Sequence, residues 1–383
     1  MPHDVAPAVG PTVWMSAAGD ATDRAVWSGI TAHLIEGARA AGLPFDGLVL
    51  GRPGERLRKA WNIMSLATTG RFGGFQYSPL FLNRMWQGQA LGGRTVASCY
   101  QVLPDWVIDA PDVTRWFYID GTLTQLWASA DYTARPLPPR RAKAALERER
   151  RGYHSATGVI CHSHWAARSV ITDYGVPEDR VHVVVPGANV EPGSYARWSA
   201  RPRAPTPTGP LRLVFVGMGG MRKGLDRLLE ALPLARAAGA ELTLSVIGCP
   251  QASMPAQLAA TPGVEWLGLV DKRRDADRFI DLVAGSEVGC LLSRSEFGGM
   301  AQREFAALAL AGLGPDVDGA PEHAGPGALL VGPDATPADI ARLLGELARR
   351  GDTYHRLRDT AWANRHTATW AHAARQLYAT LAG

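Results

Sequence analysis

The sequence predicts an α/β fold built from two doubly wound, Rossmann-like domains. The chain has 383 residues, more than a single hydrophobic core comfortably serves. Short apolar runs alternate with longer helical patterns, which is typical of a parallel sheet covered on both faces. This alternation occurs twice, on either side of residues 201–210, RPRAPTPTGP, whose four prolines exclude a helix or a central strand. We therefore interpret that segment as a linker.

The first half of the chain holds six apolar runs that end in turn residues. We expect them to form strands, and the longer amphipathic runs between them to form helices. The expected strands are Thr12–Ser16, Gly47–Leu50, Thr95–Ser98, Trp116–Ile119, Gly158–Cys161 and Val181–Val185, and the expected helices are Val26–Ala41, Pro139–Tyr153 and Trp165–Tyr174.

The second half repeats the pattern. The expected strands are Leu211–Gly217, Leu242–Gly248, Glu265–Leu267 and Val288–Leu292, and the expected helices are Gly224–Ala238, Asp275–Val283, Met300–Ala311, Ala338–Arg350 and Thr353–Leu381, the last of them broken. We place the domains at residues 1–203 and 204–365, and expect residues 366–383 to form a helix that packs back on the first domain. Two such domains imply a cleft between them, and ligands of such sheets bind beyond the carboxyl ends of the strands.

Composition narrows the class of partner. A net charge of +4 and a pI near 9.0 are too weak a basic signal for nucleic acid, but they fit an anionic small substrate or loose contact with a membrane surface. The four cysteines lack metal or redox spacing, and no apolar run has the ~18 residues that span a bilayer. The first residues do not resemble a signal peptide. We therefore expect a cytoplasmic protein, with peripheral contact at the inner membrane face left open.

A glycine-rich turn follows the first strand of the second half. In VFVGMGGMRKGLDRLLEAL, Val214–Leu232, the glycines let a backbone approach a ligand closely, and Arg222 and Lys223 stand beside a helix start, which favours a phosphate. The spacings fit neither a dinucleotide fingerprint nor a P-loop. Taken alone, such a cation pair is more often simply solvated.

The stretch SEFGGMAQRE, 295–304, places two glutamates eight positions apart around a double glycine. In a continuous helix Glu296 and Glu304 would lie about 12 Å apart along the axis. The glycines allow Glu296 to sit in a loop over the helix start while Glu304 projects from the first turns, with the positive end of the helix between them. Two solvated acids remain the alternative, since one such spacing is close to chance.

Taken together, these motifs resemble a known family. FVG…RKGLDRLLEAL, LTLSVIG, VEWLG, EFGGMAQRE and GAPE (Gly319–Glu322) resemble the retaining, two-Rossmann-domain (GT-B) glycosyltransferases of family 4. SGITAHLIEGARAAG (Ser28–Gly42) and residues 156–191 are similar to its N-terminal domain. The resemblance implies an acceptor-binding first domain and a nucleotide-sugar-binding second domain.

The resemblance also assigns roles to residues. It implies that Glu296 contacts the donor sugar and Glu304 the nucleotide ribose, while Arg222 and Lys223 neutralise the diphosphate. It places the remaining donor contacts at Gly219, Gly298, Gly299, Met300, Ala301 and Leu269, the last beside the nucleobase, and the acceptor-side loop at Ser28 and Gly29. Glu296, Lys223 and Asp120 are the candidate catalytic residues.

The sequence departs from the family pattern at three places. Met218 stands where many members have arginine, so Arg222 would substitute for it. Phe297-Gly298 comes one position early. FYIDGT, 117–122, stands where a histidine often faces the donor sugar, which makes Asp120 the candidate there.

The expected reaction is transfer from a UDP- or GDP-sugar to a glycan, a lipid-linked sugar or a small molecule. It would need no metal, because Arg222, Lys223 and a helix N-terminus can stabilise the leaving diphosphate. Asp275-Ala276-Asp277, Asp316-Val317-Asp318 and the alternating histidines 162 and 164 are interpreted as coincidental rather than as metal ligands. A UDP-sugar epimerase and a non-catalytic nucleotide-sugar-binding relic remain alternatives.

Two segments bear on the acceptor and on membranes. The aromatic, glycine-rich stretch Gly70–Gly88 could stack on an acceptor or simply pack within the domain. The basic run 138–154 could touch anionic lipid, although a solvated helix is the more usual outcome. The oligomeric state stays open.

Overall fold

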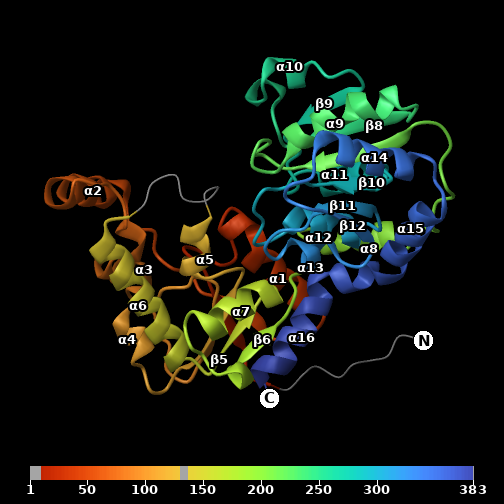
Figure 1. Cartoon of the computed structure of the whole chain (residues 1–383). Coiled ribbons are helices and arrows are strands. Elements are labelled where there is room, and N and C mark those ends of the chain that lie inside the picture. Colours follow the sequence, from red (N-terminus) through yellow and green to blue (C-terminus); the bar gives the residue numbers. More distant parts are fainter. Residues whose placement is uncertain (1–9, 130–136, 383) are drawn as a thin grey trace. The chain divides into compact units, whose positions relative to one another are not determined.

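The computed structural model describes residues 10–129 and 137–382. The chain divides into two compact units: the first takes the residues up to 185 and those from 373, and the second takes residues 186–372. Each unit is an α/β domain with one parallel sheet, as the sequence predicts (Figure 1). Each sheet has six strands, whereas six were expected from the sequence in the first half and four in the second.

The first unit's sheet has the strand order β2-β1-β3-β4-β5-β6. The order reverses between β1 and β3, so the loops after these two strands form the switch point of this sheet. Its strands are β1 (Val13–Ser16), β2 (Phe45–Gly47), β3 (Thr95–Ser98), β4 (Thr114–Ile119), β5 (Gly158–Cys161) and β6 (Val181–Val183). Its helices are α1 (Ile30–Ala40), α2 (Glu55–Thr69), α3 (Pro79–Trp86), α4 (Asp105–Ile108), α5 (Leu123–Ala128), α6 (Pro139–Ser155) and α7 (His164–Thr172).

The second unit's sheet has the order β12-β11-β10-β7-β8-β9. Here the reversal lies between β7 and β10. Its strands are β7 (Leu211–Val216), β8 (Leu242–Ile247), β9 (Val264–Gly268), β10 (Val288–Cys290), β11 (Ala311–Pro315) and β12 (Ala328–Val331). Its helices are α8 (Pro192–Ser199), α9 (Leu225–Ala237), α10 (Ala256–Ala259), α11 (Ala276–Ala284), α12 (Met300–Ala307), α13 (Ala320–Ala324), α14 (Pro337–Ala348) and α15 (Asp352–Asn364); α16 (Trp370–Ala382) follows and enters the first unit at residue 373.

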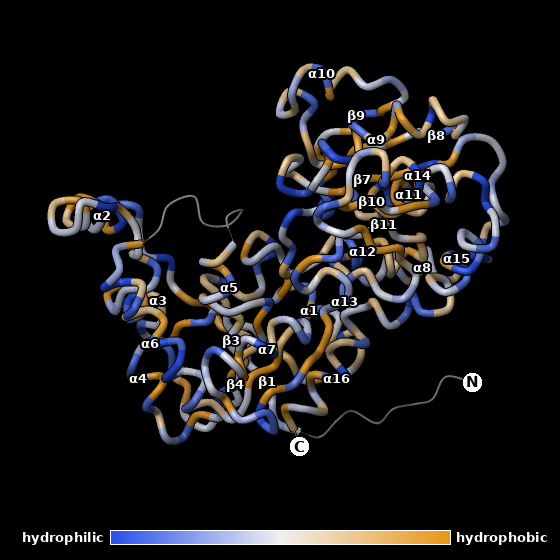
Figure 2. Tube along the Cα trace, viewed as in Figure 1, coloured by the Kyte–Doolittle hydropathy of each residue, from blue (hydrophilic) through white to orange (hydrophobic). Residues whose placement is uncertain are grey.

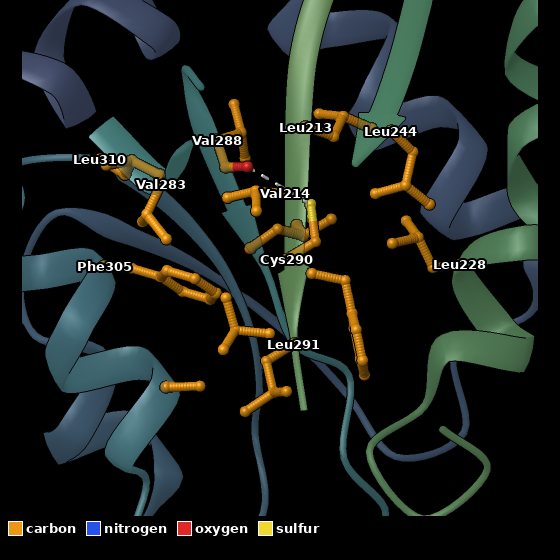
Figure 3. Close-up of a cluster of buried hydrophobic side chains, with 14 of the residues drawn as sticks. Leu213, Val214, Leu228, Leu244, Val283, Val288, Cys290, Leu291, Phe305 and Leu310 are labelled. Atoms are coloured by element: carbon orange, nitrogen blue, oxygen red, sulfur yellow. Dashed lines mark hydrogen bonds between the residues drawn. The ribbon is translucent and has the colours of Figure 1, made fainter. Parts of the chain in front are cut away.

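The core of the second unit explains why the sequences of its strands are nearly continuous apolar runs. Leu213 and Val214 are neighbours on β7 and are both buried, although their side chains point to opposite faces of the sheet. Leu228 of α9 and Phe305 of α12 lie on opposite sides of the strands (Figure 3). Helices therefore cover both faces, which is the condition for near-continuous apolar strands.

The boundary between the units precedes α8, whereas the expected division was at residues 203 and 204. The difference arises because Trp198 of α8 belongs to the core of the second unit and packs its ring 6.3 Å from that of Trp362. At the other end, Tyr378 of α16 lies in the first unit, with its ring 6.0 Å from that of Phe45.

The second strand was predicted two residues too late. The expected strand Gly47–Leu50 contains apolar residues, and Leu48 and Leu50 are indeed buried. Leu48 N–H still donates to the Met15 carbonyl of β1, but the backbone groups that follow bond the loop after β1. Ala21 N–H donates to the Leu48 carbonyl, and Leu50 N–H donates to the Gly19 carbonyl. The strand therefore ends at Gly47.

Strand β11 was missed, and its first residue was placed in the preceding helix. Helix α12 ends at Ala307, followed by a Schellman turn in which Leu310 N–H donates to the Phe305 carbonyl and Ala309 takes a positive φ of 59°. This end of the helix was not predicted from the sequence, because Ala309 occupies a position that usually holds glycine. In β11, a Cβ on Gly312 would lie 2.7 Å from that of Ala328, so close packing requires glycine in a strand where it is otherwise disfavoured.

Candidate functional site

The switch point of the second sheet brings together the loops that follow β7 and β10. The loop after β7 contains Arg222 and Lys223, and the loop after β10 contains Glu296. Ligands of open α/β sheets bind outside the carboxyl ends of strands at such a reversal. Topology alone therefore places the two motifs that the sequence singles out at one edge of the sheet.

These two loops run side by side and are held by backbone hydrogen bonds. Leu292 N–H donates to the Lys223 carbonyl, and Arg294 N–H donates to the Arg222 carbonyl. The donor–acceptor distance is 3.2 Å in both bonds. Gly224 makes this approach possible: it has a φ of 71°, and a Cβ there would lie 1.9 Å from the Leu292 oxygen. Any other residue at 224 would push the loops apart.

A second link between the loops was not predicted. The Arg294 guanidinium forms two hydrogen bonds to the Asp226 carboxylate, of 3.0 and 2.6 Å, and donates to the Met221 carbonyl. Asp226 is in the first turn of α9, where a carboxylate is favoured. The Arg294–Asp226 pair thus joins the loop that carries Glu296 to the helix that follows Lys223.

Glu296 is buried and ion-paired with Lys223. The Lys223 Nζ lies 2.6 Å from Glu296 Oε2, which also accepts from the Ser293 hydroxyl at 2.8 Å. Oε1 accepts from the Gly299 N–H at 3.2 Å. Burial by itself would raise the pKa of Glu296, but the Lys223 charge, the bonds from Lys223 and Ser293 and the charge of Arg222 hold this pKa below its usual range. The carboxylate is therefore ionised at neutral pH.

Asp318, in the turn after β11, holds the backbone of the Glu296 loop. Its Oδ2 accepts from the Ser295 hydroxyl at 2.6 Å and from the Glu296 N–H at 2.9 Å. Asp318 adopts a positive φ of 50°, a conformation that aspartate tolerates better than most residues. The aspartate that the sequence offered as part of a coincidental Asp-x-Asp pair thus positions the peptide of Glu296.

The double glycine leads directly into α12. Gly299 caps the helix with a φ of 51°, and a Cβ there would lie 2.3 Å from the Cβ of His323. Gly298 and Met300 are half-buried and Ala301 is buried. The first N–H groups of a helix point outward and attract anions, so the expected pyrophosphate contacts lie at a suitable helix end.

His323, on α13, lies beneath this turn and was not predicted. It is fully buried, and its Nε2 lies 2.7 Å from the Phe297 carbonyl oxygen. Because a carbonyl only accepts, Nε2 carries the proton. Burial and the nearby charge of Arg303 lower the pKa of His323 from 6.5 to about 4, so the ring is neutral at neutral pH.

This shift predicts a loss of stability in mild acid. Between pH 6.5 and about 4, His323 is protonated in the unfolded chain but stays neutral in the folded one. The free energy of unfolding therefore falls as pH falls, by ~3 kcal/mol for this group. A His323→Gln variant keeps an N–H donor for the Phe297 carbonyl but has no titrating ring. Its deficit relative to wild type in urea unfolding should therefore shrink from neutral pH to about pH 4; a deficit independent of pH would contradict the assignment.

Glu304 faces a different loop from Glu296. It is 2% exposed and its Oε1 pairs with Lys272, whose ammonium also lies 4.1 Å from the centre of the Phe279 ring. Lys272 follows β9 in the sequence LGLVDKRR. It was missed, although its place directly after the expected nucleobase stretch could have signalled it. Among the described residues, Lys272 is the hydrogen-bond partner that the structure gives Glu304.

The remaining donor-side residues lie in the same loops. Gly219 is exposed and accepts the Lys223 N–H through its carbonyl, and Arg222 is half-buried. Met218 and Leu269 are highly exposed, whereas Val270 is buried. The structure therefore gathers Arg222, Lys223, Glu296 and the start of α12, and it presents Leu269 as an accessible apolar group after β9.

Ser28, Gly29 and Asp120 belong to the first unit. Ser28 and Gly29 follow β1 and, with Trp27, form a turn of three residues with positive φ, beside the switch point of the first sheet. Asp120 follows β4 directly. Its charge adds to the effect of burial in raising the pKa of Cys99, which follows β3. These residues therefore occupy the carboxyl edge of the first sheet.

The residues interpreted as coincidental metal ligands have other contacts. Asp275 caps α11 by accepting from the Arg278 N–H, and Asp277 pairs with Arg197. The His162 ring packs against that of Tyr118 at a tilt of 52°, with 4.3 Å between the centres. Within residues 10–129 and 137–382, no three histidine, cysteine or acidic residues group as metal ligands would.

Comparison with known proteins bears on the family of this chain. A family model described as "Glycosyl transferases group 1" matches residues 210–350, and one described as "Glycosyltransferase Family 4" matches residues 31–192. The D-inositol 3-phosphate glycosyltransferase of Nocardia farcinica is 29% identical over an alignment of 235 residues, which covers 58% of this chain and 51% of that protein. The chain thus aligns with about half the length of this curated relative.

Solved structures share the fold over nearly the whole chain. A glycosyltransferase from Rickettsia africae has a TM-score of 0.61 at 12% identity, covering 97% of this chain and 98% of its own. Sucrose-phosphate synthase from Thermosynechococcus elongatus has a TM-score of 0.60 at 15% identity. HepE from Anabaena, solved with UDP, has a TM-score of 0.60 at 12% identity. Each alignment covers 97% of this chain and 99% of the other. At these identities the likeness concerns the fold alone, which is GT-B. Because the two family models lie in the two units of this fold, the chain belongs to the group 1, family 4 glycosyltransferases.

Proposed function

We propose that this glycosyltransferase moves a sugar from a UDP- or GDP-linked donor to an acceptor hydroxyl with retention of configuration and without a metal ion. The ion pair between Lys223 and Glu296 at the switch point carries this proposal. It sets a half-buried cation and a buried anion side by side, next to a helix N-terminus that favours an anion. Such a site suits a donor that joins a neutral sugar to a charged diphosphate.

The leaving group of the reaction is a nucleoside diphosphate. Lys223, Arg222 and the first N–H groups of α12 would stabilise its negative charge as the bond to the sugar breaks. In the proposed mechanism the acceptor attacks on the face from which the diphosphate leaves, and a phosphate oxygen takes the acceptor's proton. The positive groups are held in advance by Glu296 and by the paired loops, so little reorganisation is needed.

Glu296 would orient the sugar. Its Oε1 accepts a single, long bond from the Gly299 N–H, and a carboxylate oxygen can accept more than one. A sugar hydroxyl could therefore bond Oε1 while Oε2 keeps Lys223 and Ser293. In this arrangement Glu296 both positions the sugar and holds the cation that meets the diphosphate.

Glu304 and Lys272 would bind the ribose. A carboxylate accepts hydrogen bonds from paired hydroxyls, and Lys272 occupies Oε1 of Glu304, which leaves Oε2 for the nucleotide. Leu269 would cover one face of the base. This assignment is supported by position: Leu269 and Lys272 both follow β9, and Lys272 pairs with Glu304.

Replacing Lys272 tests this ribose assignment. Lys272→Met leaves the buried Glu304 without its cation, so we expect nucleotide affinity to fall about tenfold or more. Arg273→Ala is the matched control, since Arg273 is a largely exposed cation on the same loop. Calorimetric titration with UDP and GDP measures the effect; equal losses in the two variants would show that only the charge of the loop matters.

A donor panel tests the function itself. A bound UDP- or GDP-sugar should raise the melting temperature by a few degrees at about 100 times its Kd, and slow donor hydrolysis should release the nucleotide. Acceptor trials would begin with a phosphorylated cyclitol, as the name of the Nocardia relative suggests. Neither binding nor hydrolysis across the panel would refute the proposal. Turnover of a donor to an epimer without acceptor would support the epimerase alternative.

A further inference from the structure

Helix α2 and the turn after it expose a cluster of apolar side chains. Twelve large apolar side chains are exposed among the described residues, and five of them lie between Ile63 and Leu80. Ile63 is 70% exposed and Met64 47%, and Leu66 and Phe72 are similar to Met64. Isolated exposed apolar residues need no explanation, but a cluster of this kind marks a surface that another apolar phase covers.

The opposite face of α2 is anchored, so the exposed face is set by the fold. The Trp61 indole N–H donates to the Gly73 carbonyl at 3.0 Å, and the Ser65 hydroxyl bonds the Arg71 carbonyl at 2.5 Å. Arg141 of α6 lies over the Trp61 ring at 4.5 Å and donates to the Gly73 carbonyl. Arg141 thus ties this segment to α6 on the side of α2 opposite Ile63, and Ser65 is the residue of α2 that is buried.

The same segment carries a strong positive charge. Residues 52–71 hold five cations, Arg52, Arg56, Arg58, Lys59 and Arg71, against the single Glu55, a net +4 that equals the net charge of the whole chain. Arg56 and Lys59 precede Ile63 at helical spacings of seven and four, which puts them on its side of α2. Figure 2 shows hydrophilic and apolar residues side by side along this helix.

Helix α6, the basic run that the sequence suggested for lipid contact, uses several of its cations in contacts with neighbouring elements. Arg148 bonds the Tyr77 carbonyl, Arg150 the Tyr174 carbonyl and Arg151 the Asp105 carboxylate. These arginines hold α6 to its neighbours within the first unit. Helix α2, at the margin of this unit (Figure 1), presents the better basic surface.

We propose that the α2 surface, defined as Arg56, Lys59, Ile63, Met64, Leu66 and Phe72, docks on an anionic lipid bilayer. The helix has 15 residues, about 22 Å, and would lie in the plane of the interface with Ile63 and Met64 among the acyl chains and the cations at the headgroups. The charge favours lipid over a second copy of the chain, because a symmetric contact would bring equal positive charges together. No helix among the described residues is long and apolar enough to cross a membrane, so the contact would be peripheral.

Vesicle co-sedimentation of the full chain tests this docking. We expect binding to phosphatidylcholine vesicles that contain phosphatidylglycerol, weak binding to phosphatidylcholine alone, and loss of binding at high salt. The double variant Ile63→Ser with Met64→Ser should have a partition coefficient at least tenfold lower than wild type. The double variant Arg56→Ser with Lys59→Ser should lose about fivefold in the partition coefficient for each cation removed. The matched control is Leu234→Ser with Leu330→Ser, two exposed apolar residues of the second unit, which should bind as wild type does.

The variants should fold normally, since the replaced side chains face solvent; an unchanged melting temperature establishes this. Equal binding by the Ile63/Met64 variant and the wild type would overturn the proposal, as would no binding to anionic vesicles. A concentration-dependent dimer in sedimentation velocity without lipid, abolished by the same substitutions, would instead show that a second copy covers the surface. None of these outcomes depends on the proposed sugar transfer.

Discussion

Replacing Glu296 by glutamine should lower kcat/KM for sugar transfer about 100-fold, or ~2.7 kcal/mol of transition-state stabilisation. The amide has nearly the same shape and can still meet the Ser293 hydroxyl, but it has no charge to hold the Lys223 ammonium at 2.6 Å. The cation that should meet the diphosphate then loses its position. Steady-state kinetics with the best donor of the panel measures the loss, and product nucleotide should still bind.

The control for this substitution is Glu230→Gln. Glu230 is an exposed glutamate on α9 of the same unit, so its neutralisation changes the net charge equally and should leave the rate within about twofold. Because the pKa of Glu296 lies below its usual range, a fall in wild-type activity near pH 6 would have to come from another group. If Glu296→Gln retained full activity, Glu296 would be a structural residue and the proposed sugar contact would be wrong.

Replacing Lys223 by methionine should damage both stability and activity. It leaves the buried carboxylate of Glu296 without its cation, and removing one partner of a buried pair costs about 3 kcal/mol or more. For a unit of this size that corresponds to a lower melting temperature by roughly 6–12 °C. Transfer should fall at least 100-fold, because the proposed diphosphate site loses a cation. Thermal melting and kinetics measure the two effects separately.

The double variant Lys223→Met with Glu296→Gln separates the two roles. It has no unpaired buried charge, so it should recover much of the lost stability, yet it should remain inactive. Lys223→Arg keeps the charge and should stay close to wild type in melting temperature. A melting temperature of Lys223→Met equal to that of wild type would mean that the buried ion pair does not contribute to the fold.

Local sequence patterns predicted those helices and strands whose own residues form a recognisable apolar pattern. Strands β3 and β5 were placed at their observed bounds because each is a short apolar run that ends in turn residues. Helix α2 was missed because its apolar residues face outward, where no amphipathic periodicity relates them to a core. Strand β11, AGLGP, reads as a turn, and only the close approach of Ala328 and its place between β10 and β12 make it a strand.

The same contrast holds at the candidate site. The sequence by itself determined the two-domain α/β class, the glycine turn before Arg222 and Lys223, and the double glycine between Glu296 and Glu304, since these depend on residues close together in the chain. Only the tertiary structure decided the partners: Lys223 for Glu296, Lys272 for Glu304, Asp318 for the Glu296 backbone and His323 beneath Gly299. Each of these contacts joins segments that follow different strands of the sheet. Strand order sets which loops meet, and strand order follows from the packing of the whole sheet rather than from any local pattern.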